Sequence, residues 1–202
     1  MKYFGSPGSC SLSPHIALRE AELPFEYTKV DLRAKRTAND EDYRAINPKG
    51  YVPALVLENG ELLTENPVIL QWIADRVPAK KLAPANGTME RYRFQEWLNF
   101  ICSELHKTVF GPQFNPRASE EWKQVLRGLM EARFAVVEAH LKDHDYMVGD
   151  AFTLADSYLF TIVRWTGPMK IDLSPWPALK AHQARIGERP HVKAAMQAEG
   201  LI

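Results

Sequence analysis

The hydrophobic positions follow different periods on the two sides of about residue 80. Before it, short apolar runs rich in β-branched and aromatic residues alternate with segments of helical spacing. The pattern predicts strands over 2–4, 25–30, 52–58 and 61–63, and helices over 12–21, 39–46 and 65–77. The last two strands flank Asn59-Gly60, a dipeptide typical of tight hairpins. The order β-α-β-α-β-β-α indicates a small mixed sheet flanked by helices.

The second half of the chain predicts a helical bundle. Helical periodicity covers 88–107, 120–142, 153–165 and 177–189, and Gly, Pro and Asp interrupt it. Pro78, Pro84 and Gly87 mark a linker. We therefore expect an α/β domain over residues 1–77, a linker over 78–87 and an all-helical domain over 88–202, which is long enough for its own core.

Composition narrows the functional classes. The chain is 46% hydrophobic and 25% charged, as is usual for globular proteins, and 25 Lys and Arg balance 25 Asp and Glu. A chain without basic excess has no electrostatic footprint for nucleic acid, and no apolar run is long enough to span a membrane. The start lacks the apolar core of a signal peptide. Two cysteines, Cys10 and Cys102, make no disulfide framework, so we expect a cytoplasmic protein with free thiols.

Cys10 lies between the first predicted strand and helix. Ser11 or Ser13 can cap that helix, and a thiol at a helix N-terminus has a lowered pKa. The surrounding glycine and serines predict an exposed thiol, although a buried, inert cysteine is the alternative. The spacing is C-x-x-S, so a second thiol is missing, which argues against dithiol exchange of the thioredoxin type. A mixed disulfide between Cys10 and a small thiol is still compatible with the sequence.

Glu65 and Asn66 open the helix after the hairpin. Amide groups of a first helical turn bind anions, and a carboxylate beside them can hold an ammonium group, which together suit an amino-acid head group. Alternatively, Glu65 only complements the helix dipole. Pro53 fits the first residue or the edge of a strand, and the sequence leaves open whether its peptide bond is cis.

The first bundle helix carries an apolar seam of Trp97, Ile101 and Leu105, beside which we expect Cys102 to be buried. A polar stripe runs next to the seam, and it is either a ligand surface or a solvated face. Its members at i, i+4 and i+7 are Asn99, Ser103 and His106, flanked by Glu104 and Lys107. No second pair joins Cys102 and His106, so we expect no metal site.

Thr153 and Asp156 form a capping-box pattern ahead of the apolar run 158–163. We assign them a structural role, and the loss of such a cap costs about 1 kcal/mol and up to about 2 kcal/mol. The helix that they start is the most apolar in the chain, so we expect it at the centre of the bundle.

Seven motifs in order resemble those of the bacterial beta-class glutathione transferases over the whole chain. They are Ser6-Pro7-Gly8-Ser9-Cys10-Ser11-Leu12, Asn47-Pro48-Lys49-Gly50-Tyr51-Val52-Pro53-Ala54-Leu55, Leu63-Thr64-Glu65, Trp97-Leu98-Asn99-Phe100, Ser103-Glu104-Leu105-His106-Lys107, Phe152-Thr153-Leu154-Ala155-Asp156 and Glu188-Arg189-Pro190. The resemblance implies a thioredoxin-like first domain, an all-helical second domain and a homodimer. It also implies that Pro53 is cis and that Val52 pairs through its backbone with the cysteinyl part of glutathione.

The same resemblance implies a glutathione site. Cys10 would lie beside the glutathione sulfur, Lys35 would meet a carboxylate, and Glu65 and Asn66 would hold the γ-glutamyl head group. Relatives more often carry Ser or Gly at position 66. The helical domain or a partner subunit would contribute Asn99, Ser103, Glu104, His106 and Lys107, and Cys10 and His106 would be the catalytic residues.

The implied activity is attack of the glutathione thiolate on an electrophilic, apolar small molecule, without a metal. Trp165, Phe110 and Phe114 are candidates for the apolar pocket, and a core role is equally open for each. Two alternatives remain. Glutathione-dependent dehalogenation or disulfide reduction would use Cys10 as the nucleophile, whereas a non-catalytic scaffold could dispense with the cluster around Cys10, Glu65 and His106.

Overall fold

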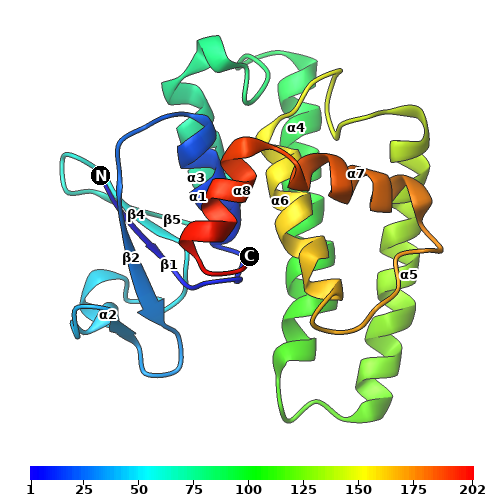
Figure 1. Cartoon of the computed structure of the whole chain (residues 1–202), viewed down its shortest axis with the longest axis horizontal. Helices are drawn as coiled ribbons and strands as arrows, with labels where there is room; N and C mark the ends of the chain where they lie inside the picture. Colours follow the sequence, from blue (N-terminus) through cyan, green and yellow to red (C-terminus); the bar gives the residue numbers. More distant parts are fainter. The chain divides into compact units, whose positions relative to one another are not determined.

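The computed structural model describes residues 1–202, which divide into two compact units. The first unit comprises residues 1–82 and 189–202, and the second comprises residues 83–188 (Figure 1). A mixed sheet with helices builds the first unit, while the second is entirely helical, so the predicted fold class is confirmed. The chain differs from the expected division at its end, because residues 189–202 belong to the first unit.

The first unit is built on a five-stranded sheet in the order β3-β2-β1-β4-β5. Strand β1 (Lys2–Gly5) runs parallel to β2 (Glu26–Asp31) and antiparallel to β4 (Ala54–Val56), which pairs with β5 (Leu62–Thr64) across the predicted Asn59-Gly60 turn. The short edge strand β3 (Arg36–Thr37) was not predicted, since two residues are too few to show a period.

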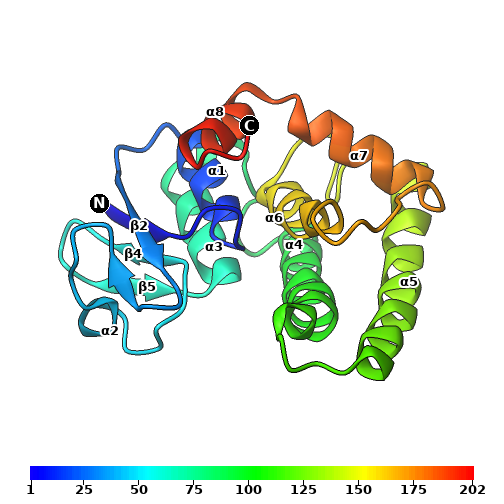
Figure 2. The same ribbon diagram turned by 60° about the horizontal axis from the view of Figure 1, so that its bottom comes forward.

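Helices cover the two faces of this sheet. Successive strand residues point to opposite faces, so Tyr3 contacts His15 of α1 (Leu12–Glu20) with ring centroids 6.0 Å apart, and Phe4 contacts Tyr43 of α2 with centroids 5.9 Å apart. Helix α2 (Tyr43–Ile46) begins later than predicted because the Asp42 carboxylate accepts from the Arg44 amide and caps it. Helices α3 (Asn66–Arg76) and α8 (Pro190–Ala198) pack beside α1 (Figures 1 and 2).

Contacts of two buried carboxylates, Glu20 and Glu199, tie the C-terminal segment to the rest of the first unit. The Arg189 guanidinium donates to both oxygens of Glu20, at 2.7 and 2.8 Å. Glu199 lies 2.9 Å from His15 Nδ1 and accepts from the Gly8 amide at 2.9 Å. A buried charge must be paired to be tolerated. These partners are more than 160 residues apart in sequence, which is why the expected boundary at residue 88 assigned this segment to the wrong unit.

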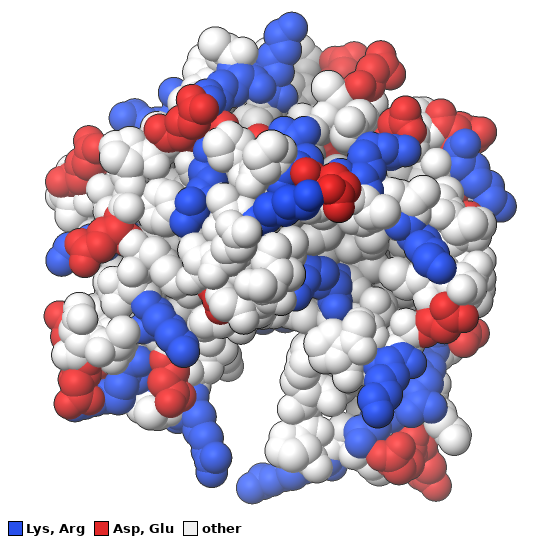
Figure 3. Space-filling view, in the orientation of Figure 1, with Lys and Arg blue, Asp and Glu red and all other residues white.

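The second unit contains four α-helices, namely α4 (Met89–Phe100), α5 (Glu120–Asp143), α6 (Leu154–Val163) and α7 (Pro177–Gly187). Helix α4 continues into a π-helical segment, Ile101–Phe110, whose i→i+5 bonding was not predicted. Every residue of α6 is buried, as expected for a central helix. No helix of the structure has the length and hydrophobicity to cross a membrane. Basic and acidic side chains are interspersed over the face shown in Figure 3, with no large patch of one sign.

Asp156 connects three segments of the second unit. Its carboxylate accepts from the Thr153 amide at 2.8 Å, which is the predicted cap contact, and from the Met147 amide at 2.8 Å. It also lies 2.9 Å from Nε2 of His182 on α7, and both side chains are fully buried. The cap is therefore one part of a larger buried network.

We predict that Asp156→Ala destabilises the fold more than a lost cap alone would. Breaking a buried pair by removing one partner costs about 3–5 kcal/mol, because the other polar groups stay buried without compensation. Urea unfolding measures the loss, and turnover per folded molecule should stay unchanged. The exposed Asp150→Ala is the matched control. Unchanged unfolding with lost turnover would instead make Asp156 a catalytic residue.

Candidate functional site

Cys10 lies in the β1–α1 loop and is buried, contrary to the exposure expected from the sequence. Only 9% of its surface is accessible, and its thiol donates to the Val52 carbonyl with a sulfur–oxygen distance of 3.4 Å. The loop folds back on itself because its serines bond to one another, with Ser9 Oγ 2.8 Å from Ser11 Oγ. The local composition predicted a polar loop correctly but did not predict that the thiol would be buried.

Ser11 occupies the N-cap position of α1 without capping it through its side chain. Its hydroxyl accepts from the Ser6 amide at 2.9 Å instead, so the predicted capping contact is wrong. The close approach also explains Gly5, because a Cβ there would lie 2.9 Å from Ser11 Oγ. The Ser11 hydroxyl, which was expected to cap the helix, thus stabilises the loop that leads to Cys10.

Three segments meet at Cys10. The Val52–Pro53 peptide bond is cis, as the resemblance implied, and Val52 is buried beside the thiol. From the first turn of α3, the Asn66 side chain donates from Nδ2 to the Cys10 carbonyl at 3.0 Å. Its Oδ1 is buried without a partner, and its backbone amide has no partner within the protein. Sequence analysis considered Asn66 only for its backbone amide and missed the link between its side chain and the Cys10 loop.

Glu65 stands next to Asn66 in an unusual backbone conformation, with φ of +71°. Such positive φ values in residues other than glycine are uncommon and concentrate at ligand-binding sites. Its carboxylate bonds to the Lys49 ammonium at 2.7 Å, and Lys49 also donates to Thr64 Oγ1 at 3.0 Å. Both charged side chains are about half exposed. Glu65 therefore binds the ammonium group of Lys49, a residue that sequence analysis did not single out. Its contact with the ammonium group of a ligand stays a prediction.

Lys35 also has a positive φ, of +57°, and lies on the same unit. Its ammonium donates to the Gly50 carbonyl at 2.8 Å and lies 5.4 Å from the centre of the Tyr51 ring. These contacts hold it at the segment that leads into Val52 and Pro53.

The predicted polar stripe of the second unit is only partly formed. Asn99, Ser103 and Lys107 are exposed, and the Ser103 hydroxyl donates to the Asn99 carbonyl at 2.9 Å. Glu104 bonds to Arg133 of α5 at 2.9 Å. His106, by contrast, is buried, because the wider π-helical turn shifts it from the stripe to the core-facing side with Leu105.

His106 contacts two side chains within the second unit. Its Nδ1 lies 2.9 Å from the Tyr158 hydroxyl of α6, and its ring meets the Trp165 ring edge-on with centroids 5.3 Å apart. Burial, together with the nearby Lys107 charge, lowers the pKa of His106 to about 4. The imidazole is therefore neutral at physiological pH.

The aromatic candidates differ from one another in exposure. Trp165 contacts Phe110 and Phe114, with ring centroids 5.9 and 5.0 Å apart. Phe110 is fully buried, whereas 53% of Phe114 is exposed. Cys102 is partly exposed, so the expectation that it would be the buried thiol and Cys10 the exposed one is wrong for both. Ile101 and Leu105 of the predicted seam are fully buried, so the seam forms, but Cys102 beside it does not share its burial.

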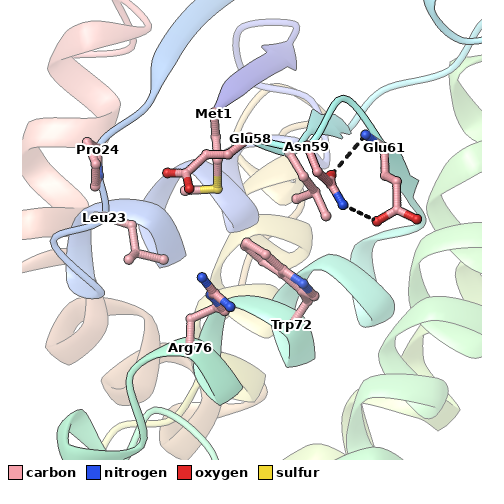
Figure 4. Close-up of a pocket in the computed structure, with 9 residues that line it drawn as sticks. Met1, Leu23, Pro24, Glu58, Asn59, Glu61, Trp72 and Arg76 are labelled. Atoms are coloured by element: carbon pink, nitrogen blue, oxygen red, sulfur yellow. Dashed lines mark hydrogen bonds between the residues drawn. The ribbon is translucent and has the colours of Figure 1, made fainter.

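A cavity of about 330 Å³ lies elsewhere in the first unit (Figure 4). Met1, Leu23, Trp72 and Arg76 are among its lining residues, so it lies near the start of β1, while Cys10 follows the end of that strand. None of the predicted site residues lines it. No three His, Cys, Asp or Glu side chains of the chain come together as a metal site would require.

Family models, curated relatives and solved structures match the chain over most or all of its length. The models of the glutathione S-transferase N-terminal and C-terminal domains match residues 8–76 and 101–190. The chain is 46% identical to glutathione S-transferase GstA of Escherichia coli O157:H7, with all of both chains covered. Two solved structures each have a TM-score of 0.96 and cover both chains fully: a sphingomonad glutathione S-transferase complexed with glutathione, 47% identical, and a beta-class enzyme of Sphingomonas chungbukensis, 46% identical.

These similarities extend over the whole chain and include both units, which confirms the family inferred from the motifs. Glutathione is accordingly the co-substrate, and the reaction is transfer of the glutathionyl group, bonded through its sulfur, to an acceptor molecule. The chain belongs to the glutathione S-transferase family, with bacterial beta-class enzymes among its similar structures.

Proposed function

We propose that the first unit binds glutathione where the Cys10 loop, the Val52–Pro53 segment and the start of α3 meet. The observation that carries this is the free backbone amide of Asn66 beside the Glu65 carboxylate. A helix N-terminus with an unpaired amide favours a carboxylate, and Glu65 favours an ammonium group, so the pair fits the two charges of a γ-glutamyl head group. Val52 would pair with the cysteinyl backbone, and Lys35 would meet the carboxylate of the glycyl end.

The proposed chemistry needs the glutathione thiol as an anion. The thiol gives its proton to solvent, and its sulfur then attacks an electrophilic carbon, while the leaving group departs with the electrons of the broken bond. Hydrogen-bond donors that favour the anion lower the free energy of this step. We propose Cys10 as the residue beside the sulfur, and the family pattern supports His106 as the second catalytic residue and Asn99, Ser103, Glu104 and Lys107 as further ligands.

For the electrophile, we propose an apolar molecule that contacts Phe114 and Trp165. Phe114 is half exposed and packs on Trp165, which itself contacts His106, so one aromatic surface reaches the residue proposed for catalysis. Phe110 is assigned to the core. The cytoplasmic location expected from the sequence remains a prediction.

We predict that Glu65→Gln raises the KM for glutathione about ten- to a hundredfold, because a hydrogen bond to a charged group contributes about 1.5–3 kcal/mol. The value of kcat should change little, since the head group lies away from the reacting sulfur. Steady-state kinetics and calorimetry with glutathione measure the effect. Unfolding should be nearly unchanged, because an exposed ion pair contributes at most about 1 kcal/mol.

Glu61→Gln is the matched control for Glu65→Gln, as it removes another exposed carboxylate from the same hairpin. An unchanged KM in the Glu65 variant would contradict the head-group assignment.

Oxidised glutathione should add one glutathionyl group to the protein, on Cys10. In this exchange the Cys10 thiolate attacks the disulfide, a mixed disulfide forms and one reduced glutathione leaves. Peptide mass mapping of the wild type, Cys10→Ala and Cys102→Ser locates the adduct. The comparison is discriminating because Cys102 is the more exposed thiol, so an adduct on Cys102 would refute the assignment.

The same variants separate conjugation from the thiol-dependent alternatives. Cys10→Ala should keep conjugation of an aryl halide, because the attacking sulfur belongs to glutathione, and should lose reduction of mixed disulfides or dehalogenation that needs a protein thiolate. Retained disulfide reduction in Cys10→Ala would exclude Cys10 as the nucleophile. A folded protein that binds glutathione but acts on no aryl halide, epoxide, hydroperoxide or mixed disulfide would favour a non-catalytic scaffold.

We also propose a homodimer, which is supported by exposed apolar side chains on α4 and α5, among them Tyr92, Val125 and Val136. Exposed apolar side chains mark interaction surfaces where they adjoin one another. Sedimentation should give twice the chain mass of 23.0 kDa. The double variant Val125→Glu with Val136→Glu should sediment as single chains, while Ile202→Glu, also at an exposed apolar position, should not. A wild type of single-chain mass would contradict the proposal.

A further inference from the structure

The cavity of about 330 Å³ in the first unit lies at the end of the sheet away from Cys10 (Figure 4). Residues before β1, residues after α1, the β4–β5 hairpin and the last two turns of α3 form it. Cys10 follows the other end of β1, and Asn66 opens the other end of α3. The cavity is therefore separate from the proposed glutathione site. Its volume lies near the lower end of the range of about 300–1,000 Å³ that is usual for small-molecule pockets.

Two opposite charges that line this cavity have no charged or hydrogen-bonding partner in the protein. The Arg76 guanidinium lies over the Trp72 indole, 5.4 Å from the ring centre, and forms no ion pair or hydrogen bond. Glu58 is an exposed residue of the hairpin, and its carboxylate is likewise unpaired. The other carboxylate of the lining, that of Glu61, accepts from Asn59 Nδ2 at 2.6 Å. Figure 4 shows Arg76 and Glu58 at the same hollow, so one small ligand can contact both.

Apolar side chains form the walls beside these two charges. Leu23, Leu57 and the Trp72 ring are only partly buried, so each keeps apolar surface that a ligand can cover. Covering such surface is favourable because it removes it from water. A guanidinium that is stacked on an indole ring presents its N–H groups as a planar fork, which matches the two oxygens of a carboxylate.

We propose that this cavity binds a free α-amino acid with an apolar side chain. The carboxylate of the ligand accepts from Arg76, its ammonium group donates to Glu58, and its side chain lies against Leu23 and the Trp72 ring. A carboxylate without an ammonium group would be repelled by Glu58 and Glu61, and an amine without a carboxylate would leave Arg76 unpaired. The zwitterion satisfies both charges. The proposal does not depend on the proposed function, because no residue of the cavity belongs to the glutathione site.

The indole N–H of Trp72 reports on occupancy of the cavity. Nitrogen NMR of the labelled protein, with this signal assigned through Trp72→Phe, should show that L-phenylalanine shifts it with a Kd of about 1 mM. Phenylpropionate lacks the ammonium group and phenethylamine lacks the carboxylate, so each should bind at least about fivefold more weakly through the loss of one charged contact. Glycine, which lacks the apolar side chain, should not shift the signal.

Two variants assign the charges of the ligand to their partners. Arg76→Gln should weaken the binding of phenylalanine about five- to tenfold and should not weaken that of phenethylamine. Glu58→Gln should weaken the binding of phenylalanine and should not weaken that of phenylpropionate. The matched controls are Lys2→Gln and Glu26→Gln, which remove exposed charges of the same unit outside the cavity and should leave the Kd unchanged.

Saturating glutathione distinguishes this cavity from the proposed glutathione site. The phenylalanine titration should be the same in its presence, and Arg76→Gln should keep the wild-type KM for glutathione. The proposal is overturned if about 10 mM phenylalanine does not shift the Trp72 signal, if glutathione displaces phenylalanine, or if phenylalanine and its two analogues bind equally well. A wild type that binds phenylalanine in this way but does not bind glutathione would reject the proposed function and support the amino-acid site.

Discussion

Two hydrogen bonds at Cys10 hold together the parts of the first unit that the proposed site requires. One runs from the thiol to the Val52 carbonyl, and the other from the Asn66 side chain to the Cys10 carbonyl. They join the end of β1, the segment before β4 and the start of α3, which are separated by 42 and 56 residues in sequence. Because these groups are buried, the loss of either bond would cost part of the desolvation free energy of a polar atom. The resulting loop is fixed before any ligand binds.

The C-terminal segment stabilises the same loop from another direction. Glu199 accepts from the Gly8 amide, two residues before Cys10, and contacts His15 on α1. Burial, with a further contribution from the Glu199 charge, raises the pKa of the neighbouring Tyr3, so this phenol stays neutral and donates to the Ser11 carbonyl. The first unit therefore consists of residues 1–82 together with residues 189–202, although residues 83–188 between them form the second unit.

In the second unit, one backbone irregularity has chemical consequences. In a straight α-helix, His106 would fall on the exposed stripe with Asn99 and Ser103, as an ordinary surface histidine. The π-helical segment turns it to the buried side, where it meets Tyr158 and Trp165 and loses its tendency to be protonated. Irregular turns of this kind occur often at functional sites. The electrostatic state of His106 therefore follows from the helix geometry and not from its local sequence.

The sequence by itself determined the order of the elements apart from β3 and α8, the hairpin at Asn59-Gly60, the central position of α6 and the cap formed by Thr153 and Asp156. These depend on periodicity and on residue preferences that act over a few positions. The family motifs added the cis peptide before Pro53 and the likeness to glutathione transferases. Tertiary structure alone decided which thiol is buried, that Lys49 pairs with Glu65, and that residues 189–202 join the first unit. Each of these depends on a partner distant in sequence or on a helical repeat that no local pattern encodes, and burial is a property of the assembled fold.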